Sequence, residues 1–198
     1  MVAAAAALAC GIGAAGMAET SVYGPAGPPP LVAAAPAVAV TSTVRVMAQP
    51  APPAPMTPVA GLSRVQTDNA RVIVEVGRAM GLPERAQVIA VACAMQESSL
   101  RNLANNTVDE SFRYPHEGRG ADHDSVGLFQ QRPSAGWGSV RDLMRPAYAA
   151  RRFYRKLVKL RGWHRMDLTV AAQAVQGSAF PQAYARHEAR AQRVVDAL

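Results

Sequence analysis

The prolines of this 198-residue chain are concentrated towards its N-terminal end. Ten of the 15 prolines lie within residues 1–62, together with 19 alanines but only one acidic and one basic residue. Because proline lacks a backbone donor and fixes φ, such a stretch cannot build packed helices or sheets. Residues 63–198 hold the other 20 basic and 13 acidic residues and have the length of one typical domain. The sequence therefore predicts one folded domain, and it excludes a two-domain globular enzyme and a multi-span membrane protein.

The first 62 residues divide into two segments. Residues 1–18 form an apolar run that ends in small residues, which is typical of a cleaved export signal, although no basic residue precedes the run. An uncleaved membrane anchor and a lipid anchor on Cys10 are the alternatives. Residues 19–62 alternate proline, alanine, valine, glycine and threonine, and this pattern predicts a disordered spacer. We therefore expect an exported protein that is extracellular or associated with the cell envelope.

Helical signals recur through the predicted domain. Thr67 is expected to cap the first helix. Apolar periodicity and proline positions predict helices over 67–80, 83–98, 139–145, 146–160, 168–178 and 181–195. No segment sustains period-two alternation, so the predicted fold class is all-α, with at most a small hairpin in the loop 99–126. In the helix 83–98, only Gln87 is polar between Ala86 and Met95, so we expect this helix to be surrounded by protein.

Glu97 stands at the end of this apolar helix. Apolar surroundings, the negative end of the helix dipole and the lack of an adjacent base all favour its protonated form. A carboxyl group that stays protonated near neutral pH can serve as a general acid. The alternative is a structural role, in which Glu97 caps the helix end or pairs with Arg101, four residues on.

A second motif, Gly127-Leu128-Phe129-Gln130-Gln131, begins thirty residues after Glu97. Together with the Glu97-Ser98 pair, and with Ala174-Val175-Gln176 further on, it resembles the motifs of the lysozyme-like lytic transglycosylases and goose-type lysozymes. The segment 65–198 also resembles actinobacterial cell-wall proteins. We therefore expect a lysozyme-like helical domain over 63–198. The expected substrate-binding residues are Ser98, Tyr114, Gly127, Phe129, Gln130, Gln131, Trp137 and Gln176.

The residue types of these motifs suit a sugar ligand. Gly127 would let the backbone approach a sugar closely. The amides of Gln130 and Gln131 can bond N-acetyl and hydroxyl groups. Tyr114 and Trp137 can stack on sugar faces, although Trp137 is as well suited to the core.

The resemblance implies cleavage of the β-1,4 bond between N-acetylmuramic acid and N-acetylglucosamine in peptidoglycan, with Glu97 as the catalytic acid. In lytic transglycosylases the same carboxyl group then acts as the base, and the muramoyl C6 hydroxyl attacks to give an anhydro product. In goose-type lysozymes, aspartates before the glycine motif position a water, and inversion follows. The residues that match here are Asp122 and Asp124, for which a loop-turn or capping role is the alternative.

Two positions depart from the family pattern. Val175 stands where the family has a tyrosine, and Gln176 stands where it has an asparagine. The role of that tyrosine would then fall to Tyr114, Tyr148 or Tyr184. These departures favour the alternative function, a non-catalytic module that binds peptidoglycan.

The long loop and the cysteines give no cofactor site. The loop 104–124 holds several acids and histidines, among them Glu110 as a reserve acid, but their spacing matches no metal site. The only cysteines are Cys10 and Cys93, which provide no disulfide framework, and Cys93 is expected to be buried. We therefore expect no metal and no cofactor.

Nineteen of the 21 basic residues are arginines, and seven basic residues cluster between Arg151 and Arg165. A basic face would concentrate the protein on the anionic cell wall. Nucleic acid is the rival partner for such a cluster, but the export-like N-terminus and the lack of a nucleic-acid motif argue against it. A solvated helix face is the plain alternative. We expect a monomer whose partner is the glycan strand of peptidoglycan.

Overall fold

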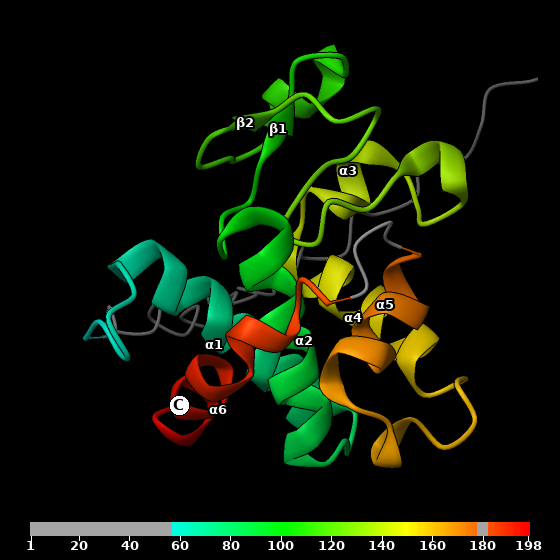
Figure 1. Ribbon diagram of the computed structural model, residues 1–198. Coiled ribbons are helices and arrows are strands. Elements are labelled where there is room, and N and C mark those ends of the chain that lie inside the picture. The colour runs from blue at the N-terminus through cyan, green and yellow to red at the C-terminus, as the bar shows by residue number, and fades with distance from the viewer. Residues whose placement is uncertain (1–56, 178–181) are drawn as a thin grey trace, which may run out of the picture. The chain divides into compact units, whose positions relative to one another are not determined.

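The structure, a computed structural model, describes residues 57–177 and 182–198 (Figure 1). Of these residues 57% are helical and strands are few and short, so the prediction of an all-α fold is confirmed for this part of the chain. The predicted export segment and membrane anchor, and residues 19–56 of the predicted spacer, lie outside the described residues. Within the described ranges, no helix is long and apolar enough to cross a membrane.

The described residues form six α-helices, four short 3-10 helices and two strands of two residues. The α-helices are α1 (Arg64–Ala79), α2 (Glu84–Ser98), α3 (Val140–Leu143), α4 (Pro146–Leu157), α5 (Leu168–Gln176) and α6 (Glu188–Asp196). The 3-10 helices are η1 (Asp109–Arg113), η2 (Pro133–Ala135), η3 (Trp163–Arg165) and η4 (Ala185–His187). The strands are β1 (Ala104–Asn105) and β2 (Arg119–Gly120).

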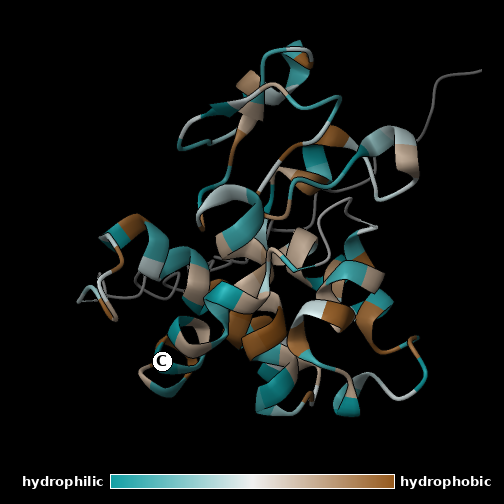
Figure 2. Cartoon of the chain, viewed as in Figure 1, coloured by the Kyte–Doolittle hydropathy of each residue, from teal (hydrophilic) through white to brown (hydrophobic). Residues whose placement is uncertain are grey.

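Helix α2 lies in the centre of the helical part. Every residue from Ala86 to Met95 is buried, including Cys93, as the sequence predicts. Helices α1, α4, α5 and α6 all contact α2, and Figure 2 shows hydrophobic residues gathered along α2. Because α2 has no polar face, its stability depends on being covered by these four helices.

Several helix boundaries differ from the sequence prediction. Helix α1 begins three residues earlier than expected, because Ser63 rather than Thr67 caps it in a capping box with Gln66. Helix α6 begins at Glu188 and not at residue 181, since the chain first forms the turn η4. Ser139 caps α3 as predicted, with its side chain accepting a hydrogen bond from the Asp142 amide.

The two strands lie in the loop that follows α2, and they pair in parallel. The two strands therefore do not form the small hairpin that the sequence allowed in this loop, because the chain makes a wide excursion through η1 before it returns beside β1. Buried Asn105 fixes the end of this excursion, since its side-chain amide donates to the carbonyl oxygens of Asp122, His123 and Ser125 at 3.2, 3.1 and 2.8 Å. One buried side chain thus sets the path of the loop that returns towards the end of α2.

The Gly-Leu-Phe-Gln motif forms a tight turn. Val126 and Gln131 pair as an antiparallel bridge, and the turn lies between them. Gly127 has φ +78°, and a Cβ at this position would lie 2.3 Å from the carbonyl oxygen of Leu143. The glycine is therefore required by the close approach of the Leu143 backbone, and not by the approach of a sugar that the sequence led us to expect.

Gly127→Ala should destabilise the domain by about 3 kcal/mol, because it adds both left-handed backbone strain and a backbone clash. Gly81→Ala is the matched control, since Gly81 has φ +67° but no atom within 4 Å of the point that a Cβ would occupy. Gly81→Ala should lower the free energy of unfolding by only about 1 kcal/mol. Urea unfolding of both variants measures the difference, and equal losses would show that the Leu143 contact does not matter.

Candidate active site

A cavity of about 590 Å³ lies at the C-terminal end of α2. Its walls come from α2, from the loop after β2, from the turn that follows the Gly-Leu-Phe-Gln motif, and from the end of α5. The lining residues are Gln96, Glu97, Asp122, His123, Ser125, Gln130, Arg132, Ala135, Trp137, Gln176 and Gly177. Five predicted site residues are therefore brought together here: Glu97, Asp122, Gln130, Trp137 and Gln176.

Glu97 is half-buried in the wall of this cavity, in the last turn of α2. Burial raises the pKa of Glu97 above its usual range, hydrogen bonds from Tyr184 and Gln176 oppose this rise, and the negative charge of Asp122 adds to it. In the described part of the chain Glu97 forms no ion pair with Arg101. The sequence expectation of a carboxyl group that resists ionisation therefore agrees with its surroundings.

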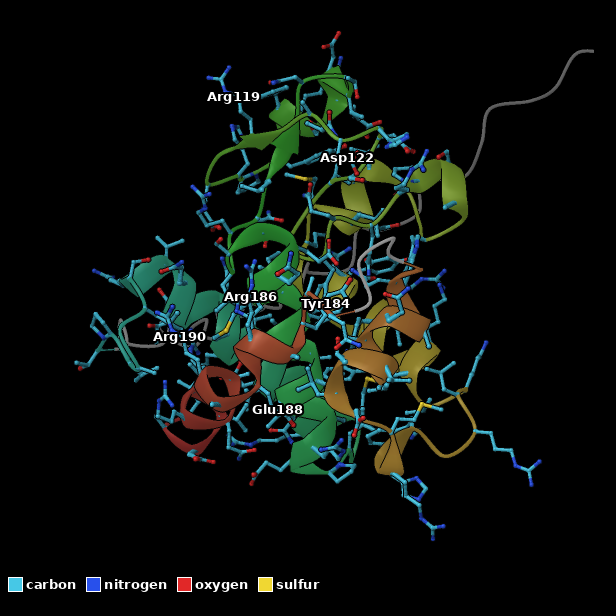
Figure 3. All side chains as sticks on the ribbon, viewed as in Figure 1. Arg119, Asp122, Tyr184, Arg186, Glu188 and Arg190 are labelled. Atoms are coloured by element: carbon cyan, nitrogen blue, oxygen red, sulfur yellow. The ribbon has the colours of Figure 1, made fainter. Side chains whose placement is uncertain are left out.

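Tyr184 donates a hydrogen bond of 2.6 Å from its hydroxyl group to Oε1 of Glu97. Tyr184 is fully buried and lies just before η4, so a segment 87 residues away in sequence returns to the end of α2 (Figure 3). Of the three tyrosines that could replace the family's tyrosine, this is the one that reaches Glu97. Tyr114 bonds Glu110 instead, and the ring of Tyr148 lies against Gly138.

Gln176 joins Glu97 to the glycine motif. Its amide nitrogen donates to the carbonyl oxygen of Phe129 at 2.7 Å, and its side chain lies near enough to Glu97 to lower the pKa of that carboxyl group. Gln176 is the last residue of α5, whereas Val175 beside it is fully buried in the core. The position that departs from the family pattern therefore still provides a polar contact to the carboxyl group.

Asp122 and His123 are exposed at the edge of the cavity. His123 Nδ1 lies 2.8 Å from Asp122 Oδ1, and the loop that carries both is held by Asn105. Asp122 is the second carboxylate of the cavity and acts on Glu97 through its charge. Sequence reasoning placed Asp122 at the site but did not assign a role to His123 or Asn105, since their contacts depend on the fold of the loop.

Asp124 does not line the cavity. Its carboxylate accepts a hydrogen bond of 2.6 Å from Arg132 Nε and one of 2.8 Å from the Ser134 amide. Partial burial raises the pKa of Asp124, but the hydrogen bonds from Arg132 and Ser134 outweigh this and hold the pKa well below its usual range. Asp124 is therefore ionised and stabilises the turn η2. This is the structural role in a loop turn that the sequence offered as the alternative to a catalytic role.

The other predicted binding residues face the protein interior or lie elsewhere. Ser98 is buried and donates to the carbonyl oxygen of Leu128 at 2.7 Å. Phe129 is fully buried and stacks on Phe153, and buried Gln131 donates to the carbonyl oxygen of Ala149. These side chains, like Gly127, support the cavity walls rather than line it.

Trp137 stands at the edge of the cavity and is only 9% exposed. The ammonium group of Lys156 lies 4.2 Å from the centre of its ring. Trp137 therefore combines the two roles that the sequence left open, since it packs against the core and also lines the cavity.

Within residues 57–177 and 182–198, no three His, Cys, Asp or Glu side chains gather closely enough to hold a metal ion. What the cavity offers chemically is a carboxyl group with a raised pKa, which accepts a hydrogen bond from the buried Tyr184 hydroxyl, together with amide groups and one exposed carboxylate. Neither a scan against protein-family models nor a search of curated proteins finds a match to this chain. Membership of the lysozyme-like families therefore stays a prediction from the motifs.

Tyr184→Phe should raise the pKa of Glu97 further, because the lost hydrogen bond favours the carboxylate form. Tyr148→Phe is the control and should leave the pKa unchanged. Carbon-13 NMR titration of labelled glutamate carboxyl groups measures both variants without requiring any activity. An unchanged Glu97 pKa in Tyr184→Phe would show that this hydrogen bond is not formed in solution.

Asp124→Asn should destabilise the domain by about 1 kcal/mol at pH 7, since the ion pair is partly exposed and screened. The folded pKa of Asp124 is depressed, so its stabilisation is present above the ordinary value of about 3.9 and is lost as the pH falls. The difference between wild type and variant should therefore shrink in urea unfolding below about pH 4. Asp109→Asn, at an exposed acid of η1, should have no such effect.

Proposed function

We propose that this protein is an exported peptidoglycan-cleaving enzyme with a lysozyme-like domain, and that Glu97 is its general acid and base. The bond cleaved is the β-1,4 bond between N-acetylmuramic acid and N-acetylglucosamine. The observation that carries the proposal is the environment of Glu97, a carboxyl group with a raised pKa in the wall of a cavity large enough for sugar rings.

The proposed reaction needs one carboxyl group for two steps. Protonated Glu97 gives its proton to the glycosidic oxygen, and the bond from that oxygen to muramoyl C1 breaks. Glu97 is now a carboxylate, and it takes the proton of the muramoyl C6 hydroxyl group while the C6 oxygen attacks C1. This step gives a 1,6-anhydro end and restores the protonated form of Glu97. Tyr184 would stabilise the intermediate carboxylate, because its hydroxyl donates to Oε1 at 2.6 Å.

Hydrolysis is the alternative outcome at the same site. It requires a second carboxylate to orient a water molecule on the opposite face of the sugar. Asp122 is the better candidate for that role, since it lines the cavity, whereas Asp124 is held by Arg132 and Ser134.

A binding module without catalysis is the second candidate function. The observation that favours it is Val175, which is buried in the core at the position of the family's tyrosine. In that case the cavity would hold glycan strands through Gln130, Gln176 and Trp137, and Glu97 would serve only as a hydrogen-bonding group.

Glu97→Gln should lower the rate of peptidoglycan cleavage by at least about 100-fold, because the amide can neither give nor take the proton. Glu75→Gln, at an exposed glutamate of α1, is the matched control and should cleave at the wild-type rate. The measurement is the mass of muropeptides that the full chain releases from purified peptidoglycan. Anhydro ends indicate transglycosylation and reducing ends indicate hydrolysis.

Equal release by wild type and Glu97→Gln would contradict the enzymatic proposal. Sedimentation of the full chain with insoluble peptidoglycan then tests the binding module. A chain that neither cleaves nor sediments with peptidoglycan would exclude both functions.

A further inference from the structure

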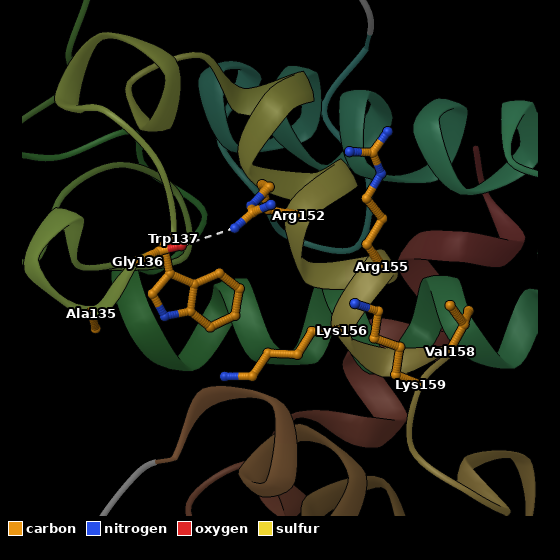
Figure 4. Close-up of a pocket in the computed structure, with 8 residues that line it drawn as sticks. All are labelled: Ala135, Gly136, Trp137, Arg152, Arg155, Lys156, Val158 and Lys159. Atoms are coloured by element: carbon orange, nitrogen blue, oxygen red, sulfur yellow. Dashed lines mark hydrogen bonds between the residues drawn. The ribbon is translucent and has the colours of Figure 1, made fainter.

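A second cavity, of about 470 Å³, shares Ala135 and Trp137 with the cavity of Glu97. Figure 4 shows the side chains of Arg152 and Lys156 beside Trp137, with Arg155 and Lys159 further along the same helix and the residues just after it. Four of the eight lining residues are basic, and none of the eight is acidic. The basic lining residues are Arg152, Arg155, Lys156 and Lys159.

These four cations lack anionic partners among residues 57–177 and 182–198. In the described part of the chain none of them forms an ion pair. Arg152 is oriented by a hydrogen bond of 2.9 Å to the carbonyl oxygen of Gly136, and Lys156 is held over the Trp137 ring. Lys156 is exposed as a whole residue, but partial burial of its side chain lowers the pKa of its ammonium group, which has no counter-charge among the described residues. A bound anion would therefore stabilise the charged form of this ammonium group.

We propose that this second cavity binds the carboxylates of the peptide that peptidoglycan carries on its muramoyl residues, an inference that rests on the proposed function. The shared wall at Trp137 and Ala135 places the cations next to the cavity in which the glycan would be cleaved. The peptide is the anionic part of the substrate, and it is attached to the same sugar whose bond breaks. A glycan seated against Glu97 would therefore present its carboxylates at this second cavity.

The residue types suit carboxylates on a flexible peptide. The guanidinium groups of Arg152 and Arg155 can donate two parallel hydrogen bonds to one carboxylate. Lys156 and Lys159 add compact charges that need no fixed geometry. Trp137 offers an apolar surface between the two cavities, on which the sugar or the peptide stem can pack.

The test is binding of N-acetylmuramyl tripeptide to the full chain, measured by isothermal titration calorimetry. This probe has free carboxylates but no glycosidic bond to cleave, so its binding does not depend on catalysis. The tripeptide with all its carboxylates amidated is the matched ligand control, and glycerol phosphate represents the phosphate groups of wall polymers. We expect the acidic tripeptide to bind at least about tenfold more tightly than the amidated one, and more weakly as salt increases.

The matching protein variants each remove two positive charges. Lys156→Met with Lys159→Met should weaken binding of the acidic tripeptide by about tenfold. Arg151→Met with Arg161→Met removes the same charge from exposed residues that do not line the cavity, and should change binding by less than about twofold. All four positions are exposed, so both variants should fold like the wild type.

Three results would overturn the inference: equal binding of the amidated tripeptide, equal losses in the two double variants, or tighter binding of glycerol phosphate than of the acidic tripeptide. Equal binding of the amidated tripeptide would show that the carboxylates are not recognised. Equal losses in the two double variants would show that only the net charge of the protein matters. Tighter binding of glycerol phosphate would show that the cavity prefers phosphate. Failure of the proposed function is seen separately, as unchanged muropeptide release by Glu97→Gln.

Discussion

The burial of α2 is the constraint on which the rest of this structure depends. A helix with apolar residues on all sides must be covered by its neighbours, and four other helices provide that cover. It must also end abruptly where the cavity begins. Ser99 and Leu100 adopt left-handed backbone conformations with φ 54° and 57°, and the Leu100 amide bonds back to the carbonyl oxygen of Ala94. This stop leaves Glu97 in the last turn, between the core and the solvent.

Glu97 is subject to opposing influences, and their balance makes it suitable for proton transfer. Burial and the charge of Asp122 favour the protonated acid, whereas the hydrogen bonds from Tyr184 and Gln176 favour the carboxylate. A group that must first give and then take a proton needs both forms to be accessible. The two donors come from segments that meet only in the folded domain, so the proton affinity of Glu97 depends on the packing of α5 and of the segment before α6.

Features that depend on local pattern could be predicted from the sequence, and features that depend on distant contacts could not. The apolar run of α2 and the exceptional place of Glu97 were predictable, because both arise from hydropathy along one helix. Tyr184 was only one of three candidate tyrosines, since its approach to Glu97 is set by long-range packing. The Gly-Leu-Phe-Gln motif was interpreted as a binding loop, but Gly127 and Phe129 serve the backbone turn and the core. A motif of glycine and apolar residues indicates that a backbone path is required, and it does not show which side chains line the cavity.

The two cavities meet opposing electrostatic demands. A protein that binds an anionic polymer needs cations near the polymer, yet a cation beside Glu97 would stabilise its carboxylate and lower its pKa. The basic side chains that line the second cavity do not line the cavity of Glu97, and Trp137 stands in the wall between the two. The charge that acts on Glu97 is instead the negative charge of Asp122. Arg132, the arginine that does line the cavity of Glu97, is paired with Asp124. The unpaired cations and the carboxyl group with the raised pKa therefore lie in different cavities of one small domain.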